Sequence, residues 1–261
     1  MPPPRPDKVR HSADFNLRRA RKSVTCVPAW KPLEANFPGA LRLAVAGHSM
    51  RRRICAYLRA VQGSNTMSTV SPLAPRTTAQ QFLSSADIEI PNCEVGIGSV
   101  ITTPDSRHLL EGVRVEPLPL WPDDRGHFME VQRTGQGLAA HFDAATTQFS
   151  ATVTYAGVVK AFHYHLRQSD CWTVVKGMLQ VALADLRKES PTFGRLNTLY
   201  LGESRPWQVL IPPGVAHGYK VIGGDSAVLV YVTSQFYDQS DECRIPFDDK
   251  HLAYDWRTQF K

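Results

Sequence analysis

The sequence predicts an all-β domain over residues 86–261, built as a jelly-roll β-sandwich or barrel. Short runs rich in β-branched residues recur there, and clusters of Gly, Pro, Asp and Ser separate them. Many short strands at this spacing, with little helical periodicity between them, are typical of such folds. The expected strands are Val95–Thr103, Val113–Leu118, Thr152–Leu166, Cys171–Lys176, Met178–Leu186, Trp207–Ile211, Val215–Ile222 and Ala227–Thr233.

Turn-forming residues bound these strands in order along the chain. Glycine and proline supply the backbone conformations that tight turns require, so their clusters mark where strands end. Only Gly135–Phe142 suggests a helical turn. The turn signals are Pro122–Gly126, Lys176-Gly177, Ser190–Gly194, Pro212-Pro213-Gly214 and Gly223-Gly224-Asp225.

The charge of the chain is divided unevenly along its length. The formal net charge is +6, yet residues 1–66 alone carry +10, from ten Arg and three Lys against three acidic residues. The other 195 residues are therefore mildly acidic, at −4. We expect residues 1–85 to be a basic, Pro- and Ser-rich extension and linker without stable structure. A targeting segment, a basic arm for nucleic acid or membrane, and a translation start at Met67 are the alternatives.

Several protein classes are disfavoured by composition. No apolar run reaches the eighteen or so residues that a membrane-spanning helix needs. The first residues contain no apolar core followed by a small-residue cleavage site, so secretion is not expected. The cysteines are odd in number and form no Cys-x-x-Cys pair, which favours reduced thiols and a cytoplasmic protein. They are Cys26, Cys55, Cys93, Cys171 and Cys243.

Strand alternation predicts that titratable side chains point into the barrel. In the run that ends at Leu166, His163 and His165 are two residues apart and so share one face. By the same rule Tyr231 shares a face with Leu229 and Thr233. Polar groups that point into a barrel interior are costly to bury, so we expect them to serve a function.

The spacing of histidines in this region also resembles the metal-binding motifs of cupins. His163-x-His165-x4-Asp170 is flanked by Gly157 and Gly177, and Pro212-x-Gly214-x2-His217 follows, with Asp170 where Glu is usual. Three imidazoles and one carboxylate suit a divalent transition metal. The alternative is that one or two of these histidines are satisfied residues of the core or rim.

Over about residues 113–256 the sequence resembles the dTDP-4-dehydrorhamnose 3,5-epimerase family, whose members are cupin-type jelly rolls that use no metal. This resemblance implies epimerisation at C3, C5 or both of a dTDP-4-keto-6-deoxy sugar, without a cofactor, in deoxysugar or polysaccharide synthesis. The segments that carry it are Asp124–Glu130, Gln148–Ser150, Gly157–His163, Asp185–Gly194, Ile211–Gly218 and Tyr231–Thr233 with the nearby Tyr237.

Residue roles follow from the same resemblance. It implies that His163 is the catalytic base and Tyr231 the acid. The family's base is oriented by an Asp beyond the residue that matches Trp256, and no Asp follows Trp256 here, so we expect Asp170 to orient His163 or His165 instead and activity to be reduced or altered. The expected substrate-binding residues are Arg125, Glu130, Gln148, Lys160, His165, His217 and Tyr237.

One of these residues conflicts with simple alternation. Lys160 stands where the family has Arg, but alternation puts it on the opposite face from His163. The resemblance therefore requires a bulge or bend between the two residues. We expect Lys160, if such a bulge is present, or else His165 to stabilise the negative charge that develops on the keto oxygen of the substrate.

Partners and alternative functions complete the expectations. The resemblance implies a nucleotide-sugar substrate and a homodimer that shares a strand, and we expect no nucleic-acid or membrane partner. A sugar 3,4-ketoisomerase is one alternative, because such enzymes resemble the chain in the pattern His163-Tyr164-His165. The others are a non-catalytic sugar-binding cupin and a metal-dependent cupin. The metal ligands of the last would be His163, His165, Asp170 and His217.

Overall fold

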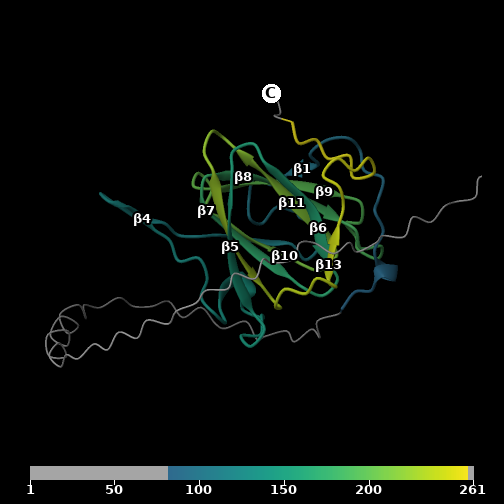
Figure 1. The fold of residues 1–261 in the computed structure, drawn as a ribbon, viewed down its shortest axis with the longest axis horizontal. Coiled ribbons are helices and arrows are strands. Elements are labelled where there is room, and N and C mark those ends of the chain that lie inside the picture. The colour runs from purple at the N-terminus through teal and green to yellow at the C-terminus, as the bar shows by residue number, and fades with distance from the viewer. Residues whose placement is uncertain (1–81, 258–261) are drawn as a thin grey trace, which may run out of the picture. The chain divides into compact units, whose positions relative to one another are not determined.

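A computed structural model describes residues 82–257, which form two β-sheets and a separate hairpin (Figure 1). The larger sheet has the strand order β1-β9-β8-β11-β6-β13, the smaller has the order β2-β10-β7-β12-β5, and β3 pairs with β4. The strands are β1 (Ser99–Val100), β2 (Arg114–Pro117), β3 (Trp121–Asp123), β4 (Gly126–Phe128), β5 (Gln148–Thr154), β6 (Val159–His165), β7 (Asp170–Lys176), β8 (Met178–Asp185), β9 (Leu196–Gly202), β10 (Trp207–Ile211), β11 (Val215–Ile222), β12 (Ala227–Thr233) and β13 (Glu242–Arg244).

This architecture confirms the predicted all-β class, with differences in detail. The expected run Thr152–Leu166 is two strands, because a turn with Gly157 at φ 76° separates β5 from β6. The helical stretch expected over Gly135–Phe142 is one 3-10 turn, η3 (Gly137–Ala139), and a second such turn is η2 (Ser85–Asp87). The predicted extension over residues 1–85 lies outside the described residues except for its last four.

The main core lies between the two sheets. Alternate residues of β7 and β12 in one sheet, such as Trp172 and Leu229, meet alternate residues of β8 and β11 in the other, such as Leu183 and Val221. All four side chains are almost fully buried. Burying an aliphatic side chain of this size contributes about 1.5–3 kcal/mol. This packing fixes the inner faces of the two sheets against each other. The inward polar residues of the sheets gather at one end of the sandwich, beyond this apolar core.

A second core covers the outer face of the larger sheet. Phe162 and Tyr164, which alternate with the inward histidines of β6, pack there against Tyr254 and Trp256 of the C-terminal segment. The Phe162 and Trp256 rings are 5.4 Å apart between centroids. Strand β6 is therefore held from both sides, which restrains the positions of its histidines.

A bulge in β6 changes the face on which Lys160 lies. His217 of β11 pairs with His163, but Tyr219, two residues on, pairs with Lys160, three residues back, so β6 carries one extra residue. Gly218 lies at this point, where a Cβ would be 2.3 Å from the Cβ of Ala161. The predicted bulge is confirmed, and it turns Lys160 toward the same cavity as His163.

The β3–β4 hairpin extends away from the sheets (Figure 1). The rings of Trp121 and Phe128 contact each other across it, 5.6 Å apart, and both remain more than half exposed. None of the helical segments between residues 82 and 257 has the length and hydrophobicity of a membrane span.

Candidate active site

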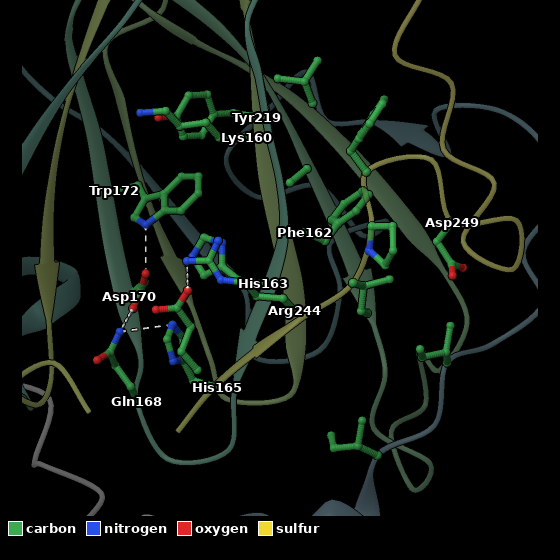
Figure 2. A pocket seen from close by; sticks show the side chains of 18 of the residues that line it. Lys160, Phe162, His163, His165, Gln168, Asp170, Trp172, Tyr219, Arg244 and Asp249 are labelled. Atoms are coloured by element: carbon green, nitrogen blue, oxygen red, sulfur yellow. Dashed lines mark hydrogen bonds and ion pairs between the residues drawn. The ribbon is translucent and has the colours of Figure 1, made fainter. Parts of the chain in front are cut away.

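A cavity of about 2020 Å³ opens between the two sheets at the end where their inward residues are polar. Drug-sized ligands occupy pockets of about 300–1,000 Å³, so this cavity has room for a larger organic ligand. Figure 2 shows its wall at β6 and β7, with His163, His165 and Asp170 turned toward one another. The cavity continues past Arg244 to Asp249 on the outer side of β6.

Four side chains from three strands meet at the cavity floor and directly beneath it. We call them the histidine–aspartate cluster, and one potential ligand atom from each lies within 4.8 Å of the others. The closest rings are those of His163 and His217, with centroids 4.1 Å apart. The members of the cluster are His163 and His165 of β6, Asp170 of β7 and His217 of β11.

A hydrogen bond to the backbone fixes the orientation of the His217 ring, and the Gln168 amide contacts the ring of His165. The Nδ1 atom of His217 is 2.9 Å from the carbonyl oxygen of Val215. A carbonyl only accepts, so Nδ1 donates and the neutral ring carries its lone pair on Nε2. In His165 the Nε2 atom accepts from the Gln168 amide at 3.3 Å, and Nδ1 lies 3.9 Å from the Asp241 carboxylate. In their neutral forms both rings therefore direct an Nε2 lone pair inward.

The loop between β6 and β7 is held by one buried carboxylate. Asp241 accepts hydrogen bonds from the backbone N–H groups of Leu166, Arg167 and Gln168, at 3.0–3.1 Å. Satisfying three donors at once fixes a loop that would otherwise be free to move. The loop in turn sets the positions of the cluster residues at its two ends.

The carboxylate of Asp170 is buried and accepts hydrogen bonds from the side chains two residues before and two residues after it in the sequence. The Gln168 amide lies 2.7 Å from Oδ1 and the Trp172 indole N–H lies 3.1 Å from Oδ2, as the dashed lines in Figure 2 mark. Burial acts to raise the pKa of Asp170, but the facing His217 and the other two imidazoles outweigh it and hold that pKa well below 3.8. The carboxylate is therefore ionised at neutral pH.

His163 is the member of the cluster with the most access to the cavity, since it is only half-buried. Burial, followed by the His217 and His165 rings, holds its pKa well below 6.5. The ring is therefore unprotonated at neutral pH and can accept a proton. Asp170, expected to orient His163 or His165, instead lies 3.5 Å from Nε2 of His217 and reaches His165 through the Gln168 amide.

Other predicted residues line the same cavity, Tyr231 and Gln148 from the facing sheet and Lys160 from β6 itself. Tyr231 of β12 is half-buried, and burial raises the pKa of its phenol, with the Ser150 hydroxyl opposing the shift. The Lys160 ammonium donates to the Thr152 hydroxyl at 3.0 Å, which leaves two of its N–H groups available. Gln148 accepts from the backbone N–H of Tyr237 at 3.1 Å, and both residues line the cavity.

Three predicted substrate-binding residues do not line the cavity of their own chain. Arg125 is exposed on the β3–β4 hairpin, where it pairs with Asp123. Glu130 lies just beyond β4 and pairs with Arg133 at 2.6 Å. His217 is almost fully buried, because the His163 ring and the Trp172 ring of the facing β7 cover it.

The structure adds residues that sequence reasoning missed. Arg244 and Glu242 of β13 line the cavity and form an ion pair 2.5 Å long. Arg244 lies opposite His163 in the register of β13 and β6, which makes it a second cation beside that residue. Gln168 and Trp172 also contribute, as donors to Asp170. In the sequence, two charged residues flank the apolar Cys243, a pattern typical of a strand with one buried face. A run of three residues is too short to predict a strand from this pattern.

Comparison with other proteins identifies the family. Residues 107–261 match the family described as dTDP-4-dehydrorhamnose 3,5-epimerase. The spore coat polysaccharide biosynthesis protein SpsL of Bacillus subtilis is 44% identical over 155 residues, which are 59% of this chain and 100% of that protein. The probable low-salt glycan biosynthesis epimerase Agl13 of Haloferax volcanii is 37% identical over 153 residues, 58% of this chain and 96% of that one.

A solved structure extends the likeness to three dimensions. NovW, a 4-keto-6-deoxy sugar epimerase from the novobiocin gene cluster of Streptomyces spheroides, superimposes with a TM-score of 0.51 at 29% identity, covering 57% of this chain and 76% of its own. Since the family match spans well over half of the sequence and includes every strand from β2 to β13, the chain belongs to the dTDP-4-dehydrorhamnose 3,5-epimerase family.

Proposed function

We propose that the protein is an isomerase that epimerises C3, C5 or both of a dTDP-4-keto-6-deoxy sugar, in the synthesis of a deoxysugar or polysaccharide. The observation that carries this proposal is that His163 and Tyr231 line one cavity from opposite sheets. Inverting a carbon requires a base on one face of the sugar and an acid on the other, and this placement provides both. We place the reaction in the cytoplasm.

The chemistry is proton abstraction next to a ketone. The 4-keto group acidifies the hydrogens on C3 and C5, and the His163 imidazole takes one of them. The electron pair moves onto the keto oxygen, which the Lys160 ammonium stabilises as the negative charge develops. The Tyr231 phenol then returns a proton to the opposite face of the carbon. The imidazolium and the phenolate exchange protons with solvent to complete the cycle.

Deuterium exchange tests the proposal directly. Incubation of dTDP-4-keto-6-deoxyglucose with the protein in deuterated water should place deuterium at C3, C5 or both, as seen by NMR. His163→Asn keeps the size and polarity of the ring's inner part but removes the base, so exchange should slow by about 10²–10⁴-fold. Absence of exchange in the unmodified protein contradicts the proposal and favours a sugar-binding role. Formation of a 3-keto product points instead to a ketoisomerase, the function that the neighbouring His165 favours.

We also propose that the active protein is a homodimer. Arg125 and Glu130 can contact substrate only in another chain's cavity, and the hairpin between them carries the exposed rings of Trp121 and Phe128. Strand β5 is an open sheet edge whose Phe149 is 55% exposed. Exposed apolar side chains on a hairpin and on an unpaired edge favour association through both.

A subunit-mixing experiment tests this arrangement. Arg125→Ala and His163→Asn proteins should each be nearly inactive. If the hairpin of one chain completes the cavity of the other, unfolding and refolding the two together creates one intact cavity in each mixed dimer. Mixing should then recover about a quarter of the normal activity. No recovery, or a monomeric mass in solution, contradicts the dimer without affecting the exchange result above.

A further inference from the structure

The histidine–aspartate cluster contains more acceptors than its own hydrogen bonds satisfy. His217 Nε2 lies 3.5 Å from the Asp170 carboxylate oxygen, and when the ring is neutral with its proton on Nδ1 both atoms are acceptors. Either a proton, the state in which His217 lowers the pKa of Asp170, or a metal ion must then lie between them. That Nε2 atom is buried and has no hydrogen-bond partner among the described residues. Buried polar atoms without partners are rare, and two facing acceptors call for a cation between them.

The other ring nitrogens extend the same pattern. The Nε2 atom of His165 faces the cluster and meets only the Gln168 amide within the described part, at a long 3.3 Å. The Gln168 nitrogen lies between this atom and Asp170, so a donor already bridges two acceptors there. In the part of the chain that the structure describes, no hydrogen bond holds the ring of His163, which faces His217 from the cavity side.

We infer that the histidine–aspartate cluster binds one divalent transition-metal ion of the Zn²⁺ or Co²⁺ class. Imidazole and carboxylate donors in a 3:1 ratio match the preferences of these ions, and they disfavour Mg²⁺ and Ca²⁺, which select oxygen. The Nδ1 atom of His217 donates to a backbone carbonyl, as the outer nitrogen of a metal-binding histidine commonly does, and that of His165 lies 3.9 Å from the Asp241 carboxylate without a hydrogen bond.

The geometry needs little adjustment to hold an ion. Two ligands of one zinc ion, each about 2.0–2.2 Å from it, lie at most about 4.4 Å apart. The cluster already brings its ligand atoms within 4.8 Å of one another, from strands that packing fixes on both sides. Small side-chain rotations close the remaining gap, and the Gln168 amide turns away as the ion enters. His163 gives the ion access from the cavity.

Cobalt titration of the full chain tests the inference. After treatment with a chelator and its removal, Co²⁺ should bind in one equivalent and produce visible absorption bands from a low-coordinate N₃O site. Titration with Mg²⁺ should neither displace it nor bind. Asp170→Asn and His163→Asn should each weaken Co²⁺ binding at least tenfold, while His108→Asn, an exposed histidine outside the cavity, should leave it unchanged.

Each outcome decides the question separately from the proposed reaction. If the unmodified protein takes up no Co²⁺, or if both cluster variants bind as it does, the inference is wrong. Circular dichroism identifies a variant that has not folded, and His163→Asn, which changes a half-buried side chain, then provides the comparison if Asp170→Asn fails. The measurement follows metal directly, so it stands whether or not deuterium exchange occurs.

Discussion

Gly218 of β11 lies against Ala161 of β6 so closely that a Cβ at position 218 would be 2.3 Å from the Ala161 Cβ. The contact occurs at the bulge that turns Lys160 and His163 to the same cavity. Gly218→Ala must therefore push the two strands apart. We expect a loss of about 1–3 kcal/mol in the free energy of unfolding, measured with urea, together with a lower rate of deuterium exchange. Gly224→Ala is the control, because a Cβ there meets no atom within 4 Å. An equal effect of both variants contradicts the role of the close contact.

Tyr231 and His163 should be separable by the fate of the proton. In Tyr231→Phe the His163 imidazole can still remove a hydrogen, exchange it with solvent and return deuterium to the same face. We expect exchange to persist while inversion falls by about 10²-fold or more, so the ratio of exchange to inversion should rise. NMR of the recovered sugar measures both quantities in one sample. A parallel loss of exchange and inversion shows that Tyr231 does more than return the proton.

Asp185 gives a prediction for pH. It is fully buried and accepts hydrogen bonds from Arg187, Ser190 and Thr192. Burial acts to raise the pKa of Asp185, but these donors outweigh it and hold that pKa below 3.8. The ionised carboxylate therefore stabilises the fold above pH 3.8, and this contribution is lost as the pH falls through the lowered native pKa.

The variant Asp185→Asn isolates that contribution. It should cost about 3–5 kcal/mol near neutral pH, because the Arg187 charge loses its partner. Urea unfolding at a series of acidic pH values should show the two proteins converging as the pH drops below 3.8. A constant difference across the series means that the carboxylate contributes through its shape and not through its charge.

Metal occupancy and the proposed reaction should exclude each other. Both use the lone pair of His163, which cannot hold an ion and remove a proton at once. Adding Zn²⁺ should therefore slow deuterium exchange, and a chelator should restore it within the same sample. Mg²⁺ provides the control, because its preference for oxygen ligands leaves the imidazoles free. Faster exchange on adding Zn²⁺ favours a metal-dependent reaction over the one proposed.

Alternation along single strands was enough to predict the inner wall of the site. It put His163 with His165 and Tyr231 with Thr233, and all four residues line the cavity. The reason is that side chains alternate strictly as long as a strand remains regular. The all-β class followed from the same local signals, since turn residues separate most of the strands at their observed ends.

Contacts between distant segments could not be predicted in this way. Arg244 meets His163 only because a three-residue strand pairs with β6, and the chain from 166 to 241 separates the two strands. Strand β9 (Leu196–Gly202) was not among the predicted strands. Its composition is typical of a strand, but no distinct turn residue separates its start from the loop that ends at Gly194. Arg125 carries a family motif, yet its position on an extended hairpin depends on how β3 and β4 pair.

The double covering of β6 has a practical consequence for anyone who handles this protein. Because Trp256 packs on Phe162, the neighbour of His163, a purification tag or label attached close behind residue 256 would lie near the outer face of β6. The turn at Gly223-Gly224, where added atoms meet nothing, is a safer point for attaching a dye or tether.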